Sequence, residues 1–147
     1  NPIVDMKKII LISLFIPFLG KAQFKIVNTA TINLLELRSD TWPINLQRVT
    51  KQSDTTYVVN FRTQEYTKDV IMKALVFPNL TQFRYFQKAL AALKSGSTGD
   101  VAEFKDYTIK RVDIKKEGIW YTLSYDGAVT NFQQTEADKM IAAIGSL

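Results

Sequence analysis

Acid–base chemistry in this sequence would have to rely on carboxylates, lysine, tyrosine and serine, because the chain has no histidine and no cysteine. This composition excludes His-containing catalytic triads, thiol nucleophiles, and zinc sites built from histidine and cysteine. The close acidic pairs are Glu65 with Asp69, Glu103 with Asp106, and Glu136 with Asp138. None lies in a context typical of a glycosidase, and no phosphate-binding loop, dinucleotide-binding glycine pattern or nucleophile elbow is present. The sequence predicts no catalytic residue, no metal ligand and no cofactor.

The stretch 109–121 (IKRVDIKKEGIWY) has the mixture of residues that binds single-stranded nucleic acid or an acidic surface. Its basic and aromatic residues are Lys110, Arg111, Lys115, Lys116, Trp120 and Tyr121. Strand alternation, however, sends Lys110 and Arg111 to opposite faces, and two acidic residues dilute the charge. We therefore interpret the stretch as a solvated hairpin with one aromatic side chain packed across the sheet. Lys110, Arg111 and Trp120 are its candidate binding residues.

Trp42 is the fourth candidate binding residue. It precedes Pro43, which cannot occupy a central strand and so indicates a loop. In that loop Trp42 either covers the edge of the core or stands exposed as a contact anchor, a role in which tryptophan is enriched.

The segment Met6–Ala22 is typical of a cleaved export signal. Two lysines precede the apolar run Ile9–Leu19, and small residues follow at the positions that signal peptidase inspects, so we expect cleavage before Gln23. The run is too short for a membrane span, which needs about 20 apolar residues. Residues 1–5 are expected to be an upstream leader with no structural role.

Removal of the signal leaves residues 23–147, which are expected to form a single domain. They contain 16 basic and 13 acidic residues, so the net charge falls from +5 for the whole chain to +3. A charge of this size is ordinary and does not indicate a nucleic-acid partner. The absence of cysteine fits a bacterial envelope better than a disulfide-stapled eukaryotic secreted domain. We expect a periplasmic or extracellular protein, typical of a Gram-negative bacterium.

Strands and one clear helix are predicted in the first half of this domain. One or two strands are expected over 24–37, and single strands over 44–51, 56–63 and 69–77, with the last in a central position. A helix then begins at Asn79, the predicted N-cap, with Gln82 three residues later as in a capping box. Its apolar stripe comprises Leu80, Phe83, Phe86, Leu90 and Leu93. A lysine and a glycine at 94–96 end it.

The second half repeats this order. Strands are expected over 104–114, 119–125 and 128–132, with Asp126-Gly127 as a two-residue hairpin turn. A final helix follows, with Thr135 as the predicted cap and Asp138 at the box position.

One irregularity interrupts the first of these strands. Tyr107 and Ile109 set an apolar phase that Val112 and Ile114 contradict, which predicts a bulge or bend at 110–111.

Runs of strands followed by helices predict an α+β fold. We expect an antiparallel sheet of about seven strands in two strands-then-helix halves, with two helices packed on one face. This order is similar to that of single-strand-binding proteins of the Whirly kind; the likeness is one of element order alone, and no motif of that family is present.

The leading functional hypothesis is a small exported domain that acts by binding. Its partner would be another protein, an envelope component or a second copy of the chain, held on the sheet face that the helices leave uncovered. Two alternatives stay open: a carboxylate-based glycan hydrolase, and a single-stranded nucleic-acid-binding module that uses 109–121. Export and the near balance of charge disfavour nucleic acid, and no membrane span is expected after signal cleavage.

Overall fold

A computed structural model describes residues 27–38, 42–64 and 70–147 of the chain. The described residues form an α+β fold with two four-stranded antiparallel sheets, each followed by a helix. The expected signal segment 6–22 and the leader 1–5 lie outside the described residues, as does the acidic pair Glu65 and Asp69. The predicted fold class and the two strands-then-helix halves are thus confirmed.

Within each sheet the strands follow one another in chain order. The first sheet comprises β1 (Thr29–Leu37), β2 (Ile44–Lys51), β3 (Asp54–Arg62) and β4 (Met72–Phe77). The second comprises β5 (Val101–Glu103), β6 (Tyr107–Ile114), β7 (Gly118–Tyr125) and β8 (Ala128–Gln133). The helices are α2 (Leu80–Lys94) and α3 (Gln134–Gly145).

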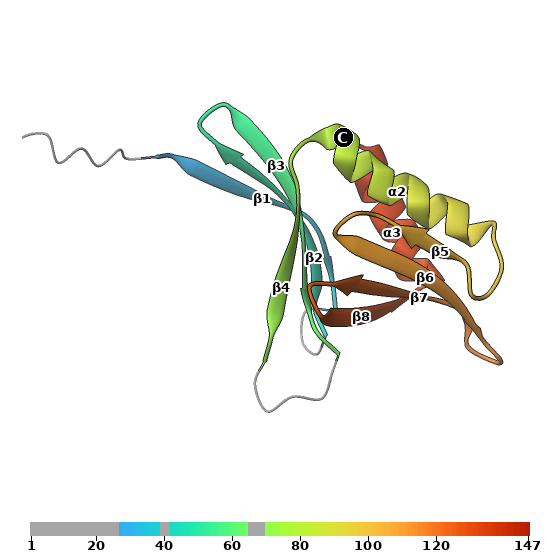
Figure 1. Cartoon of the computed structure of the whole chain (residues 1–147). Coiled ribbons are helices and arrows are strands. Elements are labelled where there is room, and N and C mark those ends of the chain that lie inside the picture. The colour runs from blue at the N-terminus through green and yellow to red at the C-terminus, as the bar shows by residue number, and fades with distance from the viewer. Residues whose placement is uncertain (1–26, 39–41, 65–69) are drawn as a thin grey trace, which may run out of the picture.

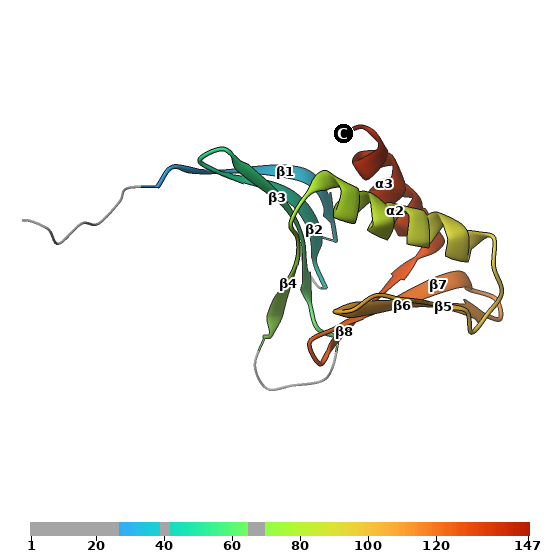
Figure 2. The same ribbon diagram turned by 45° about the horizontal axis from the view of Figure 1, so that its top comes forward.

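The two sheets lie at an angle to each other, and the helices pack on the inner side of that angle (Figures 1 and 2). Helix α2 contacts β3 and β4 of the first sheet and also β5 and β6 of the second. Helix α3 contacts β7 and β8 of its own sheet and β1 of the other. Each helix therefore ties the two sheets together, and the outer face of each sheet is left without a covering helix.

An aromatic cluster on α2 forms the centre of the core. Phe83 stacks on Tyr57 of β3 with ring centroids 5.0 Å apart. Phe86 lies between Phe77 of β4 at 5.6 Å and Tyr107 of β6 at 6.0 Å. The predicted stripe of this helix is confirmed, with all members buried except the partly buried Leu80. The predicted N-cap is confirmed as well, because the Gln82 N–H donates to Asn79 Oδ1 at 2.9 Å.

A short segment after β3 joins the two sheets. The Gln64 N–H donates to the Val129 carbonyl of β8 at 2.7 Å, and the Val129 N–H donates to Thr63 Oγ1 at 3.2 Å. The side chains continue the junction, since Asn131 Nδ2 donates to Gln64 Oε1 at 2.8 Å. Residues 63–64 thus run along β8 and hold the two sheets together.

The structure corrects the predicted positions of some strands. β4 is an edge strand instead of a central one, because α2 follows it and carries the chain to the other sheet. The expected strand 104–114 begins later, as β6 at Tyr107, and a short strand that was not predicted, β5, precedes it. The two are separated by a turn in which the Phe104 N–H donates to the Tyr107 carbonyl at 2.9 Å. There are consequently eight strands in two sheets in the described part of the chain, not about seven in one.

The predicted bulge at 110–111 is wrong. β6 pairs with β7 in unbroken register from Tyr107 opposite Tyr125 to Ile114 opposite Gly118. The register shift between described strands lies instead in the first sheet, between Asn33 and Leu35 of β1.

The predicted cap of the last helix is also wrong. The helix begins earlier than expected, and the Gln133 N–H donates to the Glu136 carboxylate at 3.0 Å. Asp138 is not a capping residue, because its carboxylate accepts hydrogen bonds from Lys94 Nζ at 2.9 Å and Gln134 Nε2 at 2.8 Å.

Replacement of Phe86 by alanine should destabilise the whole fold, because its ring contacts both sheets. We expect Phe86→Ala to lower the free energy of unfolding by about 3–5 kcal/mol. Its neighbour Tyr85 is 45% exposed, so Tyr85→Ala is the matched control and should change stability by about 0.5 kcal/mol or less. Urea denaturation of the three proteins measures this, and equal midpoints for the two variants would contradict it.

Candidate functional site

The apolar residues of β6 change faces along the strand because a charged residue, Arg111, occupies a core position on the inner face. Arg111 lies opposite Tyr121 on the inner face of the second sheet and is 8% exposed. Because alternation continues without a bulge, Val112 and Ile114 point to the outer face. Trp120 of β7 lies directly opposite Val112. An apolar patch is thereby formed on the face that no helix covers.

The Arg111 guanidinium caps the C-terminus of α2. Its Nη1 donates to the carbonyls of Leu93, Lys94 and Gly96 at 3.0, 2.8 and 2.7 Å. Its Nε and Nη2 donate to the two carboxylate oxygens of Asp113 at 2.8 and 3.0 Å. The last carbonyls of a helix lack partners within the helix and favour a cation, so this arrangement is stabilising. The hydrogen bond from Arg111 also lowers the pKa of Asp113.

The candidate residue Arg111 is therefore not a surface residue. Its donors are directed at the helix end and at Asp113, which leaves its guanidinium committed to the fold. Lys110, in contrast, is exposed on the outer face, between Val101 of β5 and Thr122 of β7. The structure therefore brings Lys110 and Trp120 to one face and separates both from Arg111, as strand alternation predicts.

A hollow of about 300 Å³ lies on the outer face beside Trp120. It is lined by Gln64, Val112, Ile114, Glu117, Trp120, Thr122 and Asn131, and we call it the Trp120 hollow. Its apolar part consists of the indole, Val112 and Ile114, the last of which is 39% exposed.

The polar side of the Trp120 hollow is held rigid by a chain of hydrogen bonds. Thr122 Oγ1 donates to Asn131 Oδ1 at 2.7 Å, and Asn131 Nδ2 donates to Gln64 Oε1 at 2.8 Å. Gln64 Nε2 in turn donates to the Asn131 carbonyl at 3.2 Å. The indole N–H of Trp120 is buried, and no acceptor reaches it among the described residues. A buried donor without an acceptor costs free energy.

Trp42 lies apart from this hollow, immediately before β2. It is half-buried, and the guanidinium of Arg62 at the end of β3 stacks over its ring at 4.6 Å from the centroid. The indole is thus covered on one side by a cation–π contact. The indole is not among the apolar side chains that pack against the core, and both expected roles, a cover at the edge of the core and a contact anchor, stay predictions.

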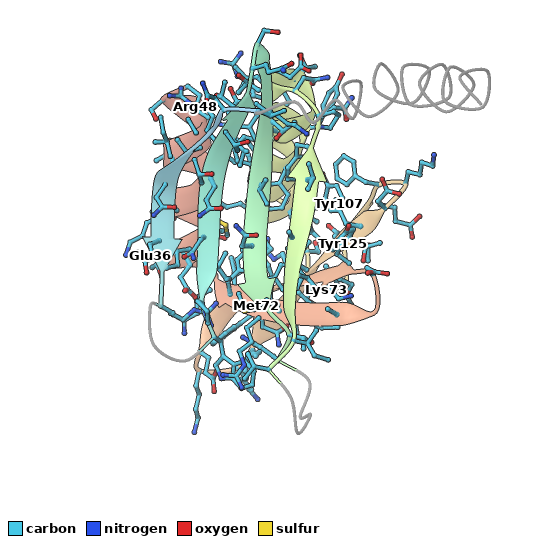
Figure 3. The ribbon with its side chains drawn as sticks, turned by 90° about the vertical axis from the view of Figure 1, so that its left-hand side faces the viewer. Glu36, Arg48, Met72, Lys73, Tyr107 and Tyr125 are labelled. Atoms are coloured by element: carbon cyan, nitrogen blue, oxygen red, sulfur yellow. The ribbon has the colours of Figure 1, made fainter. Side chains whose placement is uncertain are left out.

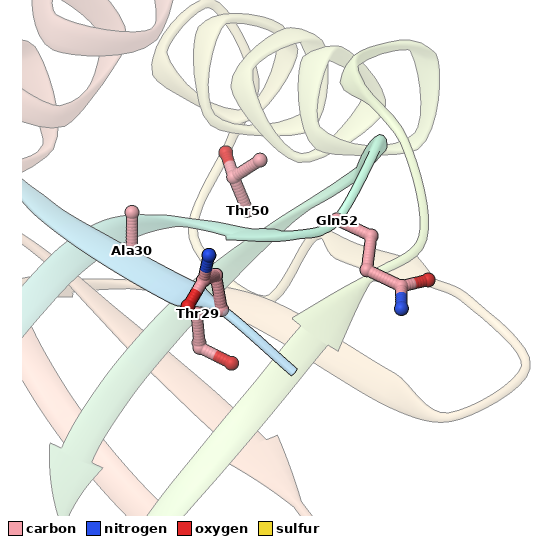
Figure 4. A pocket seen from close by; sticks show the side chains of 5 residues that line it. Thr29, Ala30, Thr50 and Gln52 are labelled. Atoms are coloured by element: carbon pink, nitrogen blue, oxygen red, sulfur yellow. The ribbon is translucent and has the colours of Figure 1, made fainter. Parts of the chain in front are cut away.

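The outer face of the first sheet is a less favourable binding surface because its central amides satisfy one another. Gln47 Nε2 donates to Asn33 Oδ1, and Asn60 Nδ2 donates to Gln47 Oε1, both at 2.8 Å. A hollow of about 510 Å³ at the start of β1 has only small or neutral polar residues in its lining: Asn28, Thr29, Ala30, Thr50 and Gln52 (Figure 4). It offers a ligand neither a charge nor a large apolar side chain.

The acidic pairs have structural or solvent-exposed positions. Glu136 forms an ion pair with Arg38 at 2.7 Å, and Asp138 forms one with Lys94 at 2.9 Å. The hydrogen bond from Lys94 lowers the pKa of Asp138. Glu103 and Asp106 are exposed. Within residues 27–38, 42–64 and 70–147, no cluster of three or more acidic residues could hold a metal ion.

Sequence reasoning missed Gln64 and Asn131. They meet only at the junction of the two sheets, 67 positions apart, and no local pattern brings them together. Val112 and Ile114 could have been found from the sequence, because their apolar side chains fall on the opposite face of β6 from Tyr107 and Ile109. This pattern indicates a strand with apolar residues on both faces and not a bulge.

No known protein family matches this sequence, and neither a curated protein nor a solved structure is significantly similar to it. In the part of the chain that the structure describes, none of the helices has the length and apolarity needed to cross a membrane.

Loss of the Arg111 cap should destabilise the protein much more than loss of its neighbour's charge. We expect Arg111→Met to lower the melting temperature by about 10 °C, because two helix carbonyls, the Gly96 carbonyl and Asp113 lose their donor. Lys110→Met is the matched control and should change it by about 2 °C or less, since Lys110 is exposed. Calorimetry checks this, and similar shifts in both variants would contradict the capping role.

Acid should weaken the fold through Asp113 and Asp138. Both have a lowered pKa in the folded state, so their contribution is present above the unfolded pKa of about 3.9 and is lost as the pH falls through the folded value. Urea unfolding followed from pH 7 to pH 2 should therefore show stability falling below about pH 4. The double variant Asp113→Asn, Asp138→Asn should flatten this fall, and an unchanged acid profile would contradict the assignment.

Proposed function

We propose that this protein is an exported, non-catalytic binding domain that holds a partner protein on the outer face of its second sheet. The observation that carries the proposal is the Trp120 hollow, in which an aromatic and aliphatic floor lies beside a rigid amide wall. Export rests on the sequence pattern of Met6–Ala22. With 147 residues and neither histidine nor cysteine, the chain is better suited to recognition than to chemistry.

The hollow has the chemistry of a protein-binding anchor site. Tryptophan is enriched at the energetic centre of interfaces, where it lies in a small desolvated pocket. Val112, Ile114 and the indole of Trp120 would contact an apolar side chain of the partner, and the amides of Gln64 and Asn131 lie beside them on the polar side of the hollow. Lys110 and Glu117 flank this region with opposite charges, which would orient the partner more than they would add affinity.

The two alternative functions have less support. Single-strand binding through 109–121 would need several cations on the face of Trp120, yet Arg111 lies on the other face in the helix cap. Glycan hydrolysis would need two carboxylates across a cleft, whereas Glu136 and Asp138 are each held in an ion pair with a cation.

Photo-crosslinking tests the proposed surface. The photoreactive residue benzoylphenylalanine placed at Ile114, on the rim of the hollow, should yield a discrete protein adduct in a bacterial envelope fraction. The same residue at Ala91, exposed on α2, is the matched control and should not yield that adduct. Trp120→Ala should reduce the affinity for the crosslinked partner about 30-fold, as expected for a hot spot of about 2 kcal/mol.

Two outcomes would contradict the proposal. Equal adducts from Ile114 and Ala91, or an adduct that Trp120→Ala leaves unchanged in a variant with unaltered melting temperature, would exclude this surface. An adduct that is removed by nuclease and by high salt would favour the nucleic-acid alternative instead.

A further inference from the structure

The four edges of the two sheets differ in how well they are protected against an added strand. β1 carries a register shift between Asn33 and Leu35, which disrupts regular pairing. β5 has three residues, and β8 is lined by the segment 63–64. β4, in contrast, is a regular strand of six residues at the end of its sheet. It has neither a register shift nor a described segment paired along its free side.

Exposed apolar side chains gather at this same edge. Among the described residues, eight large hydrophobic side chains are exposed, and four of them belong to β4 or the two residues before it. They are Val70 at 62%, Ile71 at 39%, Met72 at 49% and Val76 at 53% exposure. The one charged residue of the strand, Lys73, is turned inward and bound to Asp126 at 2.8 Å. An inward-pointing charge is one device that protects an edge, but it leaves the exposed side chains of this strand apolar, and an apolar edge marks an interaction site.

The backbone of β4 presents free hydrogen-bonding groups at every second residue. The Thr63 N–H donates to the Ile71 carbonyl at 3.0 Å, which makes this pair a hydrogen-bonded pair of the antiparallel ladder. Since such pairs alternate, residues 71, 73, 75 and 77 direct their backbone groups toward β3. The N–H and C=O groups of Met72, Ala74 and Val76 therefore point away from the sheet, and no backbone hydrogen bond from a described loop reaches them.

A hollow of about 130 Å³ lies beside this edge, on the inner side of the strand. It is bounded by Leu75–Pro78 on one side and by Phe104–Tyr107 on the other. Phe104 stacks on Tyr107 with ring centroids 4.4 Å apart, so the far wall is a rigid aromatic pair. Figure 3 shows Tyr107 and Tyr125 of the second sheet beside the free edge of β4, near Lys73.

We infer that β4 is a docking edge for an extended apolar segment of a partner protein, which would be added as a fifth strand of the first sheet. The free groups of Met72, Ala74 and Val76 would supply the main-chain hydrogen bonds. Alternate side chains of the segment would pack against this outer row and enter the hollow under Phe104. Peptide recognition by strand addition has this division of labour, with backbone bonds for affinity and a pocket for specificity.

A second copy of the chain fits this edge less well. Two β4 strands paired antiparallel would be related by a two-fold axis perpendicular to the sheet, which places both inner faces on the same side. Parts of the second sheet extend past the β4 edge (Figure 3), so a second copy would bring its own second sheet to the same side of the joined sheet. A lone strand brings no second sheet with it. This edge is distinct from the Trp120 hollow, so the inference does not depend on the proposed function.

The test uses a short fluorescein-labelled peptide of alternating valine and threonine with a lysine at each end. Fluorescence anisotropy should show saturable binding to the whole protein, and a peptide with proline at its centre should not bind. Amide exchange should slow at least tenfold at Met72, Ala74 and Val76 on binding. The amides of Lys73 and Leu75, which already face β3, should change little. This alternation is the signature of strand addition, which binding to a side-chain pocket alone would not produce.

Two variants and a control complete the test. Ala74→Pro removes the central N–H and should abolish binding, and Val76→Lys should weaken it at least tenfold without altering the backbone. Trp120→Ala should leave it unchanged. Absence of alternating protection, or equal binding by Val76→Lys at unchanged melting temperature, would overturn the inference. Protection of the same amides that appears without peptide and rises with protein concentration would assign the edge to a second copy and overturn it as well.

Discussion

The capping of α2 by Arg111 is the interaction on which the rest of the structure depends. The guanidinium satisfies three carbonyls at the end of the helix and is itself neutralised by Asp113. It also occupies a core position of β6 that an apolar residue would otherwise hold. Strand alternation places its neighbours Val112 and Ile114 on the outer face of the second sheet beside Trp120. One strand thus ends a helix with its inner face and supplies the apolar surface of the candidate site with its outer face.

The two-sheet architecture explains why binding surfaces remain. Both helices lie inside the angle between the sheets, and the aromatic cluster of Phe83, Phe86 and Tyr107 is buried there. The junction of residues 63–64 with β8 closes the sheets on one side and also builds the amide wall of the Trp120 hollow. The first sheet ends at β4 because the chain leaves it through α2. An uncovered face and an open edge are therefore products of the same connectivity.

Much of the local structure could be predicted, whereas the role of individual polar residues could not. The Asn79 cap and the Asp126-Gly127 turn were recognised because their signals lie within a few residues. The two turn residues have positive φ values of 49° and 72°. Asp138 was misassigned as a capping residue because its partner, Lys94, lies on another helix. Capping signals compete with tertiary ion pairs, and only the folded chain shows which contact forms.

By itself, the sequence determined the fold class, the order of the helices and of the described strands other than the short β5, and the exclusion of histidine and cysteine chemistry. These follow from composition and from periods of two and 3.6 residues, which are local properties of the chain. The tertiary structure decided that Arg111 is buried, that Gln64 meets Asn131 and that β4 is an edge. Each of these depends on contacts between residues far apart in the chain. Periodicity shows which face of a strand or helix a residue occupies, but not which other element packs against that face.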